Sequence, residues 1–586
     1  MDFFGRSAYC GEVEENLVEN QVRLCGWVEK VRNHGGLIFI DLRDRSGIVQ
    51  LVCKPEEKDV WNIAENVKNE FVLAAYGTVL RRAPEAVNNK VKTGKWEVGV
   101  QELKILAESK VPPFQLSEQE KISEEMRLSY RYFDLKSSKM QENIRLRHKV
   151  IFAMRKFLDS DDFCEIETPI LSKSTPEGAR DFLVPSRMHP GSFYALPQSP
   201  QIYKQLLMAS GFEKYFQVAR CFRDEDLRAD RQLEFTQLDI EMSFVNEADV
   251  QALCEKLVLQ VLKDVGFKAV SAPFPKLTYK EAFSRFGCDR PDTRFGMEIK
   301  DITKVFEGTE INFLKRTIDG GGKIGAICVK DQNFSRGQLD KWCEFATEKL
   351  GANGLLYFRQ KDGDKIDSKI SKMLPENFLD SVKQCVPGFE SGDVLFAVAG
   401  NYDFTWTVLG RLRLEMAKQL DLIDDSLMNF VWVTDFPMFE WNENDKRFYA
   451  MHHPFTMPKG DLITKNMRDL TARAYDLVLN GVEIAGGSIR INTAEMQRQV
   501  FGVLGMKEEE YNEKFGFLLK ALQYGFPPHG GIAFGLDRLV MMLVGETSIR
   551  DVIAFPKTTA GACLMMQSPS GVSEDQLKEL GLRLKK

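Results

Sequence analysis

The residues best suited to chemistry lie between positions 220 and 239, in the run RCFRDEDLRADRQLEFTQLD. Alternating apolar residues on either side predict two antiparallel strands joined by a long charged loop. Arg223 and Glu225 are two residues apart, as are Phe235 and Gln237, so each pair shares one face of its strand. Such a face can hold a nucleotide, with arginine on a phosphate, glutamate near an amino group and phenylalanine on the base. The alternative is a solvent-exposed charged turn, which is what most charge runs are.

Two acidic residues, Asp476 and Glu483, flank a tight turn at Asn480-Gly481. We expect a helix before this turn and a strand after it, with Arg490 lying seven residues beyond Glu483. Paired carboxylates that face phosphates usually bind Mg²⁺, which prefers oxygen ligands. Spacing alone favours an ordinary surface pair, so both interpretations stay open at this point.

A third chemical feature is a helix start at Ser199-Pro200, where serine is a favoured cap and proline suits the first turn. Gln201 and Lys204 follow in the first turns, and a helix N-terminus is a good place to hold a carboxylate. The histidine pair in MHHPF has no nucleophile placed to use it and is typical of a packed loop.

Composition narrows the class of protein. A length of 586 residues suggests about three to five domains, and a net charge of -6 gives no overall attraction to nucleic acid. Any RNA contact must therefore use local basic patches. No run is long and apolar enough to span a membrane, and the N-terminus has no apolar core of a signal peptide. The 11 cysteines are scattered, which predicts reduced thiols in the cytosol and argues against a zinc site.

The first 107 residues contain five short alternating segments separated by glycine turns, which suits a small barrel such as an OB-fold. A generic β-sandwich is the alternative. Basic residues lie around the turn at His34, and Phe39 follows where its ring can stack on a base. A core position for Phe39 is the competing interpretation.

Three ordered motifs resemble those of class II aminoacyl-tRNA synthetases. Thr168-Pro169 in CEIETPIL is similar to motif 1, FRDE in the charged run to motif 2, and GLDR at 535–538 to motif 3. TPEGARDFLVPS, LPQSPQIYKQLLM, MHHPF and EIAGGSIRI narrow the resemblance to the bacterial type of aspartyl-tRNA synthetase, along essentially the whole chain. Leu233 stands where that family usually has proline, and we expect only a local change in loop stiffness.

The resemblance implies a multidomain α+β fold. It implies an OB-fold anticodon-binding barrel over 1–107, a linker over 108–135, and a class II catalytic domain over 136–289 and 426–586. That catalytic domain has an antiparallel sheet with flanking helices, and 290–425 form an inserted α+β domain. Motif 1 implies a homodimer.

The resemblance also implies the site residues. The catalytic residues are Arg223 and Arg538. The ATP-binding residues are Arg223, Asp224, Glu225, Gln232, Phe235, Glu483, Gly535, Leu536, Asp537 and Arg538, with Mg²⁺ on Asp476 and Glu483. The aspartate-binding residues are Glu177, Ser199, Gln201, Lys204, Arg223, Asp239, His452 and Arg490, with His452 the better candidate of the two histidines. The anticodon-binding residues are Arg32, His34, Phe39 and Gln50.

The implied reaction joins L-aspartate to ATP as aspartyl-adenylate and then passes the acyl group to tRNA. Two alternatives are a related class II enzyme for asparagine or lysine, and a tRNA-binding paralogue without activity. The second would require damage to Arg223, Glu483 or Arg538, and all three are present.

The residue at position 34 bears on which tRNA is charged. In this family, leucine there tends to accompany restriction to tRNA-Asp, and histidine tends to accompany charging of tRNA-Asn as well. A histidine can donate or accept a hydrogen bond and so meet more than one base edge. Because this chain has His34, we expect both tRNAs to be charged, with a separate amidotransferase acting on Asp-tRNA-Asn. A strictly discriminating enzyme, or an exposed turn residue without a role, is the alternative.

Overall fold

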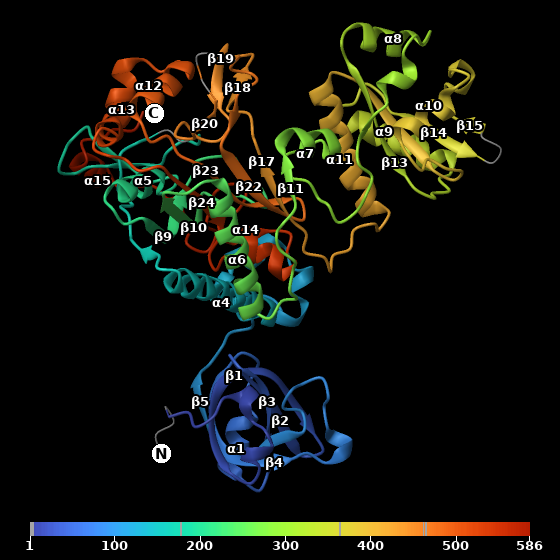
Figure 1. The fold of residues 1–586 in the computed structure, drawn as a ribbon. Coiled ribbons are helices and arrows are strands. Elements are labelled where there is room, and N and C mark those ends of the chain that lie inside the picture. The colour runs from blue at the N-terminus through green and yellow to red at the C-terminus, as the bar shows by residue number, and fades with distance from the viewer. Residues whose placement is uncertain (1–4, 176–177, 362–364, 461, 463–465, 586) are drawn as a thin grey trace. The chain divides into compact units, whose positions relative to one another are not determined.

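The computed structural model describes residues 5–175, 178–361, 365–460, 462 and 466–585. The chain divides into two compact units, Met1–Glu142 and Asn143–Lys586. Each unit is described by itself (Figure 1).

The first unit is built on a closed five-stranded barrel with strand order β1-β2-β3-β5-β4. The strands are β1 Gln21–His34, β2 Leu37–Asp44, β3 Gly47–Cys53, β4 Val72–Arg81 and β5 Trp96–Ala107. Along β2 buried and half-buried side chains alternate, so Ile38, Ile40 and Leu42 fill the barrel and Phe39 faces outward. The predicted OB-fold is therefore confirmed, and Phe39 is not a core residue.

Short helices accompany the barrel and continue along the stretch predicted as a linker. They are η1 Cys10–Glu12, η2 Glu15–Leu17, α1 Lys58–Ala64, η3 Pro84–Ala86, η4 Leu116–Lys121, α2 Glu124–Ser129 and α3 Arg131–Asp134. Asp134 is fully buried, and it accepts hydrogen bonds from Arg127, Arg131 and Gln119. These hydrogen bonds give residues 119–134 a packed structure of their own.

The second unit is organised around an eight-stranded sheet with order β11-β17-β22-β23-β24-β10-β9-β6. The strands are β6 Cys164–Glu165, β9 Lys214–Phe222, β10 Glu234–Ser243, β11 Lys276–Thr278, β17 Phe430–Thr434, β22 Ala474–Leu479, β23 Val482–Ile489 and β24 His529–Gly535. All neighbouring pairs are antiparallel except β6 with β9 and β11 with β17. The predicted antiparallel sheet is confirmed.

One face of this sheet carries the main core. Helices α4 Ser138–Ser160, α6 Glu247–Asp264 and α14 Leu536–Val544 pack against it. Their contribution includes Met154, Val250, Leu257 and Val540, which meet Leu238, Ile240, Leu477 and Ile532 of the strands. Because side chains alternate along a strand, the intervening residues project from the opposite face.

The β22–β23 hairpin corrects one expectation. Residues 474–479 form a strand, so the prediction of a helix before the Asn480-Gly481 turn is wrong. All six residues of β22 are buried, and a strand buried on both faces lacks the alternation that distinguishes it from a helix. The Asn480-Gly481 pair indicates a β-hairpin, because both residues have positive φ, 51° and 84°, as a tight hairpin turn requires.

Residues 300–400 contain a separate five-stranded sheet with order β12-β13-β16-β14-β15. Its strands are β12 Lys300–Asp301, β13 Lys323–Val329, β14 Leu356–Lys361, β15 Lys365–Asp367 and β16 Val394–Gly400. Its accompanying helices are η5 Thr303–Phe306, α8 Asn312–Asp319, α9 Arg336–Glu348, η6 Ser371–Met373, α10 Phe378–Cys385 and α11 Tyr402–Gln419. Two buried apolar clusters pack around this sheet, which agrees with the predicted inserted α+β domain.

The remaining elements connect or cover the large sheet. They are β7 Leu183–Pro185, β8 Phe193–Ala195, α5 Gln201–Ala209, α7 Tyr279–Phe286, β18 Phe439–Asn442, β19 Arg447–Ala450, β20 Pro458–Lys459, β21 Thr471–Ala472, α12 Ala494–Val503, α13 Glu508–Ala521, η7 Ile549–Asp551 and α15 Glu574–Glu579. Within the described part of the chain, no helix has both the length and the apolar character needed to cross a membrane.

Candidate active site

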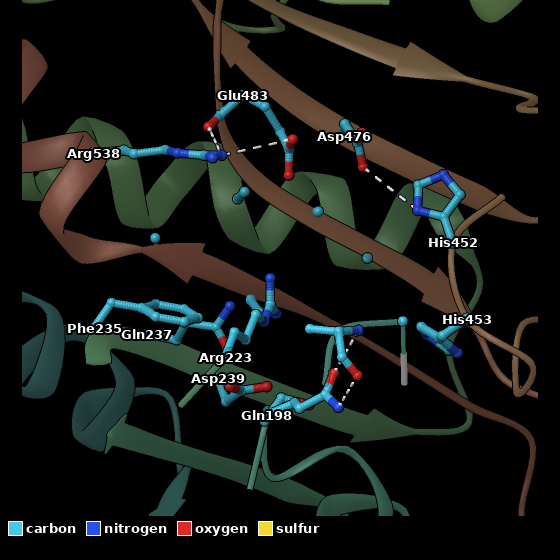
Figure 2. Close-up of a pocket in the computed structure, with 18 of the residues that line it drawn as sticks. Gln198, Arg223, Phe235, Gln237, Asp239, His452, His453, Asp476, Glu483 and Arg538 are labelled. Carbon is cyan, nitrogen blue, oxygen red and sulfur yellow. Dashed lines mark hydrogen bonds and ion pairs between the residues drawn. The ribbon is translucent and has the colours of Figure 1, made fainter. Parts of the chain in front are cut away.

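A cavity of about 590 Å³ opens on the face of the large sheet away from helices α4, α6 and α14. Strand β10 supplies Phe235, Gln237 and Asp239 to it, because its even-numbered neighbours Leu238 and Ile240 are in the core. Figure 2 shows these side chains with residues from β23, the MHHPF loop and the start of α14 around one space.

The structure brings most of the predicted site residues together. Those that line the cavity are Ser199, Gln201, Lys204, Arg223, Glu225, Gln232, Phe235, Asp239, His452, Asp476, Glu483, Arg490, Gly535, Asp537 and Arg538. They come from segments that are far apart in the chain, so the sheet topology assembles the site.

The inner end of the cavity is a buried network of charges. Lys204 Nζ lies 2.5 Å from Asp239 Oδ1 and 3.4 Å from Glu241 Oε2. Arg490 donates from Nε and Nη2 to the two oxygens of Glu241, at 2.9 and 3.1 Å. All four side chains are at most 2% exposed. Two cations held by buried acids are suited to binding a small carboxylate in a fixed orientation.

Glu241 was missed by the sequence reasoning, although it lies two residues after Asp239 on the same strand face. Burial by itself would raise the pKa of the Glu241 carboxyl, but Arg490 and Lys204 hold that pKa below its usual value. Space for this carboxylate depends on Gly531 of the neighbouring strand, where a Cβ would lie 2.1 Å from Glu241 Oε2. The acid is therefore ionised and fixed by its surroundings.

The two histidines of MHHPF have different neighbours. His453 Nε2 lies 2.6 Å from Arg490 Nη1, whereas His452 Nδ1 lies 4.0 Å from Asp476 Oδ1 and its ring meets Phe436 edge to face. Burial, followed by the charge of Arg490, lowers the pKa of His452 to about 4 and that of His453 well below its usual value. Both rings are thus neutral, and it is His453 that adjoins the guanidinium.

The outer end of the cavity holds an arginine, an aromatic ring and two ion pairs. The Arg223 guanidinium carbon lies 5.0 Å from the centre of the Phe235 ring. Glu225 pairs with Arg231 at 3.1 Å, and Arg538 Nη2 lies 3.3 Å from Asp230 Oδ2. This arrangement can accept an aromatic base and a chain of phosphates.

The acid pair lies on the β22–β23 hairpin, and Figure 2 shows Arg538 pointing toward Glu483. A Cβ at Gly486 would lie 2.8 Å from Asp476 Oδ1 and 3.4 Å from Glu483 Oε1, so the bare backbone leaves room for both carboxylates. Asp476 Oδ1 is buried without a hydrogen-bond partner among the described atoms. Burial, followed by the neighbouring charge of Glu483, raises the pKa of Asp476 well above its usual value. A cation between the two carboxylates would relieve both effects.

Some predicted residues have other surroundings. Leu536 is fully buried in the main core, and Asp224 is not among the residues that line the cavity. The Asp537 carboxylate accepts from Arg147 at one oxygen and from the Thr236 backbone N–H at the other, so it joins α4 to β10.

Gln232 donates to the Lys557 carbonyl and accepts from the Lys557 N–H, at 3.0 and 2.7 Å. Glu177 lies outside the described residues.

On the barrel of the first unit, three of the predicted RNA-binding residues lie together. Arg32 and Phe39 face each other across β1 and β2, and Arg32 Nη2 donates to Gln50 Oε1 at 3.2 Å. Arg32 also pairs with Asp41 at 2.7 Å. His34 lies two residues beyond Arg32 on β1 and is exposed at the end of the strand, beside a turn of two glycines with positive φ.

Comparison with known proteins agrees with this architecture. Residues 123–559 match the family of tRNA synthetases class II (D, K and N), and residues 22–106 match the OB-fold nucleic acid binding domain. Asparaginyl-tRNA synthetase from Pyrococcus horikoshii, solved with asparaginyl-adenylate, shares the fold with a TM-score of 0.59 at 21% identity, over 94% of this chain and 98% of that one. The fold is therefore that of a class II synthetase, as predicted.

Two relatives are similar along their whole length. Aspartate--tRNA(Asp/Asn) ligase of Geobacillus sp. (strain WCH70) is 50% identical over 585 residues, which cover 99% of this chain and 98% of that protein. Aspartate--tRNA ligase of Bacillus licheniformis is 49% identical over 590 residues, which cover 100% and 99%. The chain belongs to the class II aminoacyl-tRNA synthetases and, within them, to the aspartate–tRNA ligases. Enzymes of this class use ATP as a substrate, and this family binds aspartate and tRNA.

Proposed function

We propose that this protein activates L-aspartate with ATP and transfers it to tRNA-Asp and to tRNA-Asn. The observation that carries the proposal is the buried group of Lys204, Asp239, Glu241 and Arg490 at the inner end of the cavity. It offers a guanidinium and an ammonium to a side-chain carboxylate, and an acid to a substrate ammonium. Asparagine lacks the side-chain charge, and a site that leaves buried charges unpaired can reject an analogue by about 10⁴-fold.

The first step of the reaction depends on how the site residues position aspartate and ATP. The α-carboxylate of aspartate is ionised at neutral pH, so its attack on the α-phosphorus of ATP needs no general base. The bond between the α- and β-phosphates breaks, and pyrophosphate leaves. The acyl group then passes to a hydroxyl of the terminal adenosine of the tRNA, and AMP leaves. Arg223 would hold the α-phosphate as charge develops on it, and Phe235 would stack on the adenine. Arg538 would hold the γ-phosphate at the outer end, with Glu225 near the base. Asp239, Ser199 and Gln201 would hold the substrate ammonium.

Asp476 and Glu483 fit Mg²⁺, because Gly486 leaves space for their carboxylates and one oxygen of Asp476 has no hydrogen-bond partner in the described part of the protein. When bound, the ion supplies positive charge to the phosphates. Across the described residues no three metal-ligating side chains gather in one place, so the phosphates and water would complete the coordination.

Pyrophosphate exchange tests the amino-acid assignment. Purified protein is supplied with ATP, Mg²⁺ and one amino acid at a time, and exchange is expected with L-aspartate and not with asparagine or lysine. Exchange with asparagine at a similar kcat/KM would refute the assignment to aspartate.

The tRNA assignment rests on the barrel. His34 is exposed at the end of β1, where a ring nitrogen can meet a base edge. The names of the relatives divide between Asp/Asn and plain aspartate forms, so family membership alone does not choose between them. Aspartylation of tRNA-Asp and tRNA-Asn transcripts by the wild type and by His34→Leu tests the proposal. Wild type is expected to charge both, and His34→Leu to lose tRNA-Asn preferentially.

Two outcomes separate the parts of this idea. If wild type does not charge tRNA-Asn, the relaxed specificity is refuted. If both proteins charge it equally, the relaxed specificity stands and His34 is not its cause. Asp-tRNA-Asn formed in this way would require an amidotransferase before translation, and we place the activity in the cytoplasm, where tRNA charging supplies the ribosome.

We also propose a homodimer. Phe152 on α4 is 63% exposed, and Ile170 and Leu171 beyond β6 are 49% and 53% exposed. Apolar side chains left outside in the motif 1 region suit a subunit interface. Analytical ultracentrifugation is expected to give twice the chain mass of 66.9 kDa, and Phe152→Glu is expected to shift the protein toward monomer.

A further inference from the structure

Gln198 lies directly before Ser199, and the structure places Pro200 rather than the predicted Ser199 at the N-cap of α5. Gln198 is 4% exposed, yet no part of the proposed mechanism uses its side chain. Its Oε1 accepts from the Ala179 N–H at 3.0 Å, and its Nε2 donates to the Ala179 carbonyl at 2.8 Å. Nε2 also donates to Asp181 Oδ1. The amide therefore pairs with the backbone of one residue, as a neighbouring β-strand would.

The segment held in this way is residues 178–181, which we call the cavity loop. Gly178 and Ala179 line the 590 Å³ cavity, beside Ser199 and Gln201. The side chain of Asp181 is held a second time, by Ser174 Oγ at 2.6 Å. Gln198 and Asp239 line the same cavity, and Figure 2 shows both side chains.

The other edge of the cavity loop is tied to the charged run. The Arg180 carbonyl accepts from the Asp224 N–H at 3.1 Å, directly after Arg223. The carbonyl of Pro197, which precedes Gln198, accepts from the Phe222 N–H at 2.9 Å. The loop therefore lies between two chain segments that both carry site residues, and Gln198 fixes the end toward the amino acid.

We propose that Gln198 is a positioning residue for aspartate binding, which acts through the Ala179 backbone to hold the cavity loop against the amino-acid end of the site. The proposal rests on the proposed function. A second cavity, of about 270 Å³, is also lined by Gln198 and Ser199, together with Asp181. Without the amide, the Ala179 N–H and carbonyl would lose their hydrogen bonds to Gln198, and the cavity loop would lose this attachment to the amino-acid end of the site.

The test compares Gln198→Ala with Gln205→Ala in aspartate-dependent pyrophosphate exchange. Gln205 lies one helical turn beyond Gln201, is 1% exposed, and lines neither cavity, so it controls for loss of a buried glutamine. We expect Gln198→Ala to raise the KM for aspartate by about 10- to 100-fold, because two backbone hydrogen bonds are lost. The KM for ATP, kcat at saturation and the melting temperature are expected to stay close to those of the Gln205→Ala variant.

A charge exchange gives a sharper readout. Gln198→Glu places a second carboxylate against Asp181 and is expected to raise the KM further, and adding Asp181→Asn restores a donor and is expected to lower it again. If Gln198→Ala and Gln205→Ala behave alike, or if the losses fall equally on ATP and aspartate, Gln198 only supports the fold and the proposal is refuted. If wild type shows no aspartate-dependent exchange, the proposed function fails instead.

Discussion

Replacing Arg490 by lysine keeps the positive charge and removes the planar fork. In the structure this guanidinium donates to both oxygens of Glu241, and Nη1 donates to Ser488 Oγ at 2.6 Å. A lysine ammonium is a point charge on a flexible stem, and it cannot face Glu241 with two parallel donors while presenting a third to the substrate. The substrate carboxylate would then lose at least one fixed donor.

The size of the effect follows from the hydrogen bond that lysine cannot make to the substrate. One charge-assisted hydrogen bond is worth about 1.5–3 kcal/mol. At about 1.4 kcal/mol per factor of ten, this predicts a fall in kcat/KM for aspartate of roughly 10- to 150-fold. Arg490→Leu removes the charge as well and leaves Glu241 with Lys204 alone. Besides the loss of aspartate binding, we therefore expect this variant to lower the free energy of unfolding by about 3–5 kcal/mol.

Pyrophosphate exchange with aspartate measures the effect, and urea unfolding checks that the variant is folded. Arg473→Lys is the matched control, because Arg473 also donates from Nε and Nη2 to the two oxygens of a glutamate, Glu247, but does not line the cavity. The reasoning is refuted if Arg490→Lys keeps more than about half of the wild-type kcat/KM, or if Arg473→Lys loses as much.

Three further predictions follow from the site and the barrel. Arg223→Ala is expected to lower the rate of adenylate formation by about 10²–10³, with the oligomeric state unchanged, and near-normal pyrophosphate exchange would remove Arg223 from the mechanism. His452 has a folded pKa of about 4 against an ordinary value of 6.5, so the unfolded chain takes up its proton first and stability falls as the pH drops from 6.5 to 4. His452→Gln is expected to make the pH dependence of the unfolding free energy shallower across this range, by up to about 1.4 kcal/mol per pH unit, and an unchanged slope would show that His452 is not held neutral. Phe39→Ala is expected to weaken tRNA binding by about 1–3 kcal/mol while pyrophosphate exchange stays normal, and equal binding by filter assay would exclude stacking on this ring.

Local patterns were sufficient for the parts of the fold that alternate. Strands β1 and β10 could be predicted because apolar and polar residues alternate along much of their length. Strand β22 could not be predicted in this way, since it is buried throughout and its sequence is as compatible with a helix. The Asn480-Gly481 turn favours a hairpin, and it is a better guide to this segment than the apolar run before it.

In the site, too, some residues could be predicted from the sequence and others could not. Residue type predicted which side chains could meet ATP and a carboxylate, and most of them line one cavity. What the sequence could not provide was the second layer that holds them. In the sequence, Glu241 is an ordinary strand residue, and its partner Arg490 lies 249 positions later. Gln198 is part of a predicted helix start, and only the structure shows its hydrogen bonds to the Ala179 backbone. Such roles depend on contacts between distant segments, which residue type and spacing do not encode.

Gly531 limits how the amino-acid preference of this enzyme can change, because the site needs the space that its missing side chain leaves. Any side chain at this position would displace the Glu241 carboxylate, and with it the orientation of Arg490. Replacing Glu241 by a smaller residue would not release position 531, because a Cβ there would still lie 2.1 Å from the Ile240 carbonyl oxygen. A directed-evolution library aimed at a neutral amino acid should therefore keep Gly531 and vary positions 241 and 490 together, because a single substitution at either position passes through a protein with an unpaired buried charge.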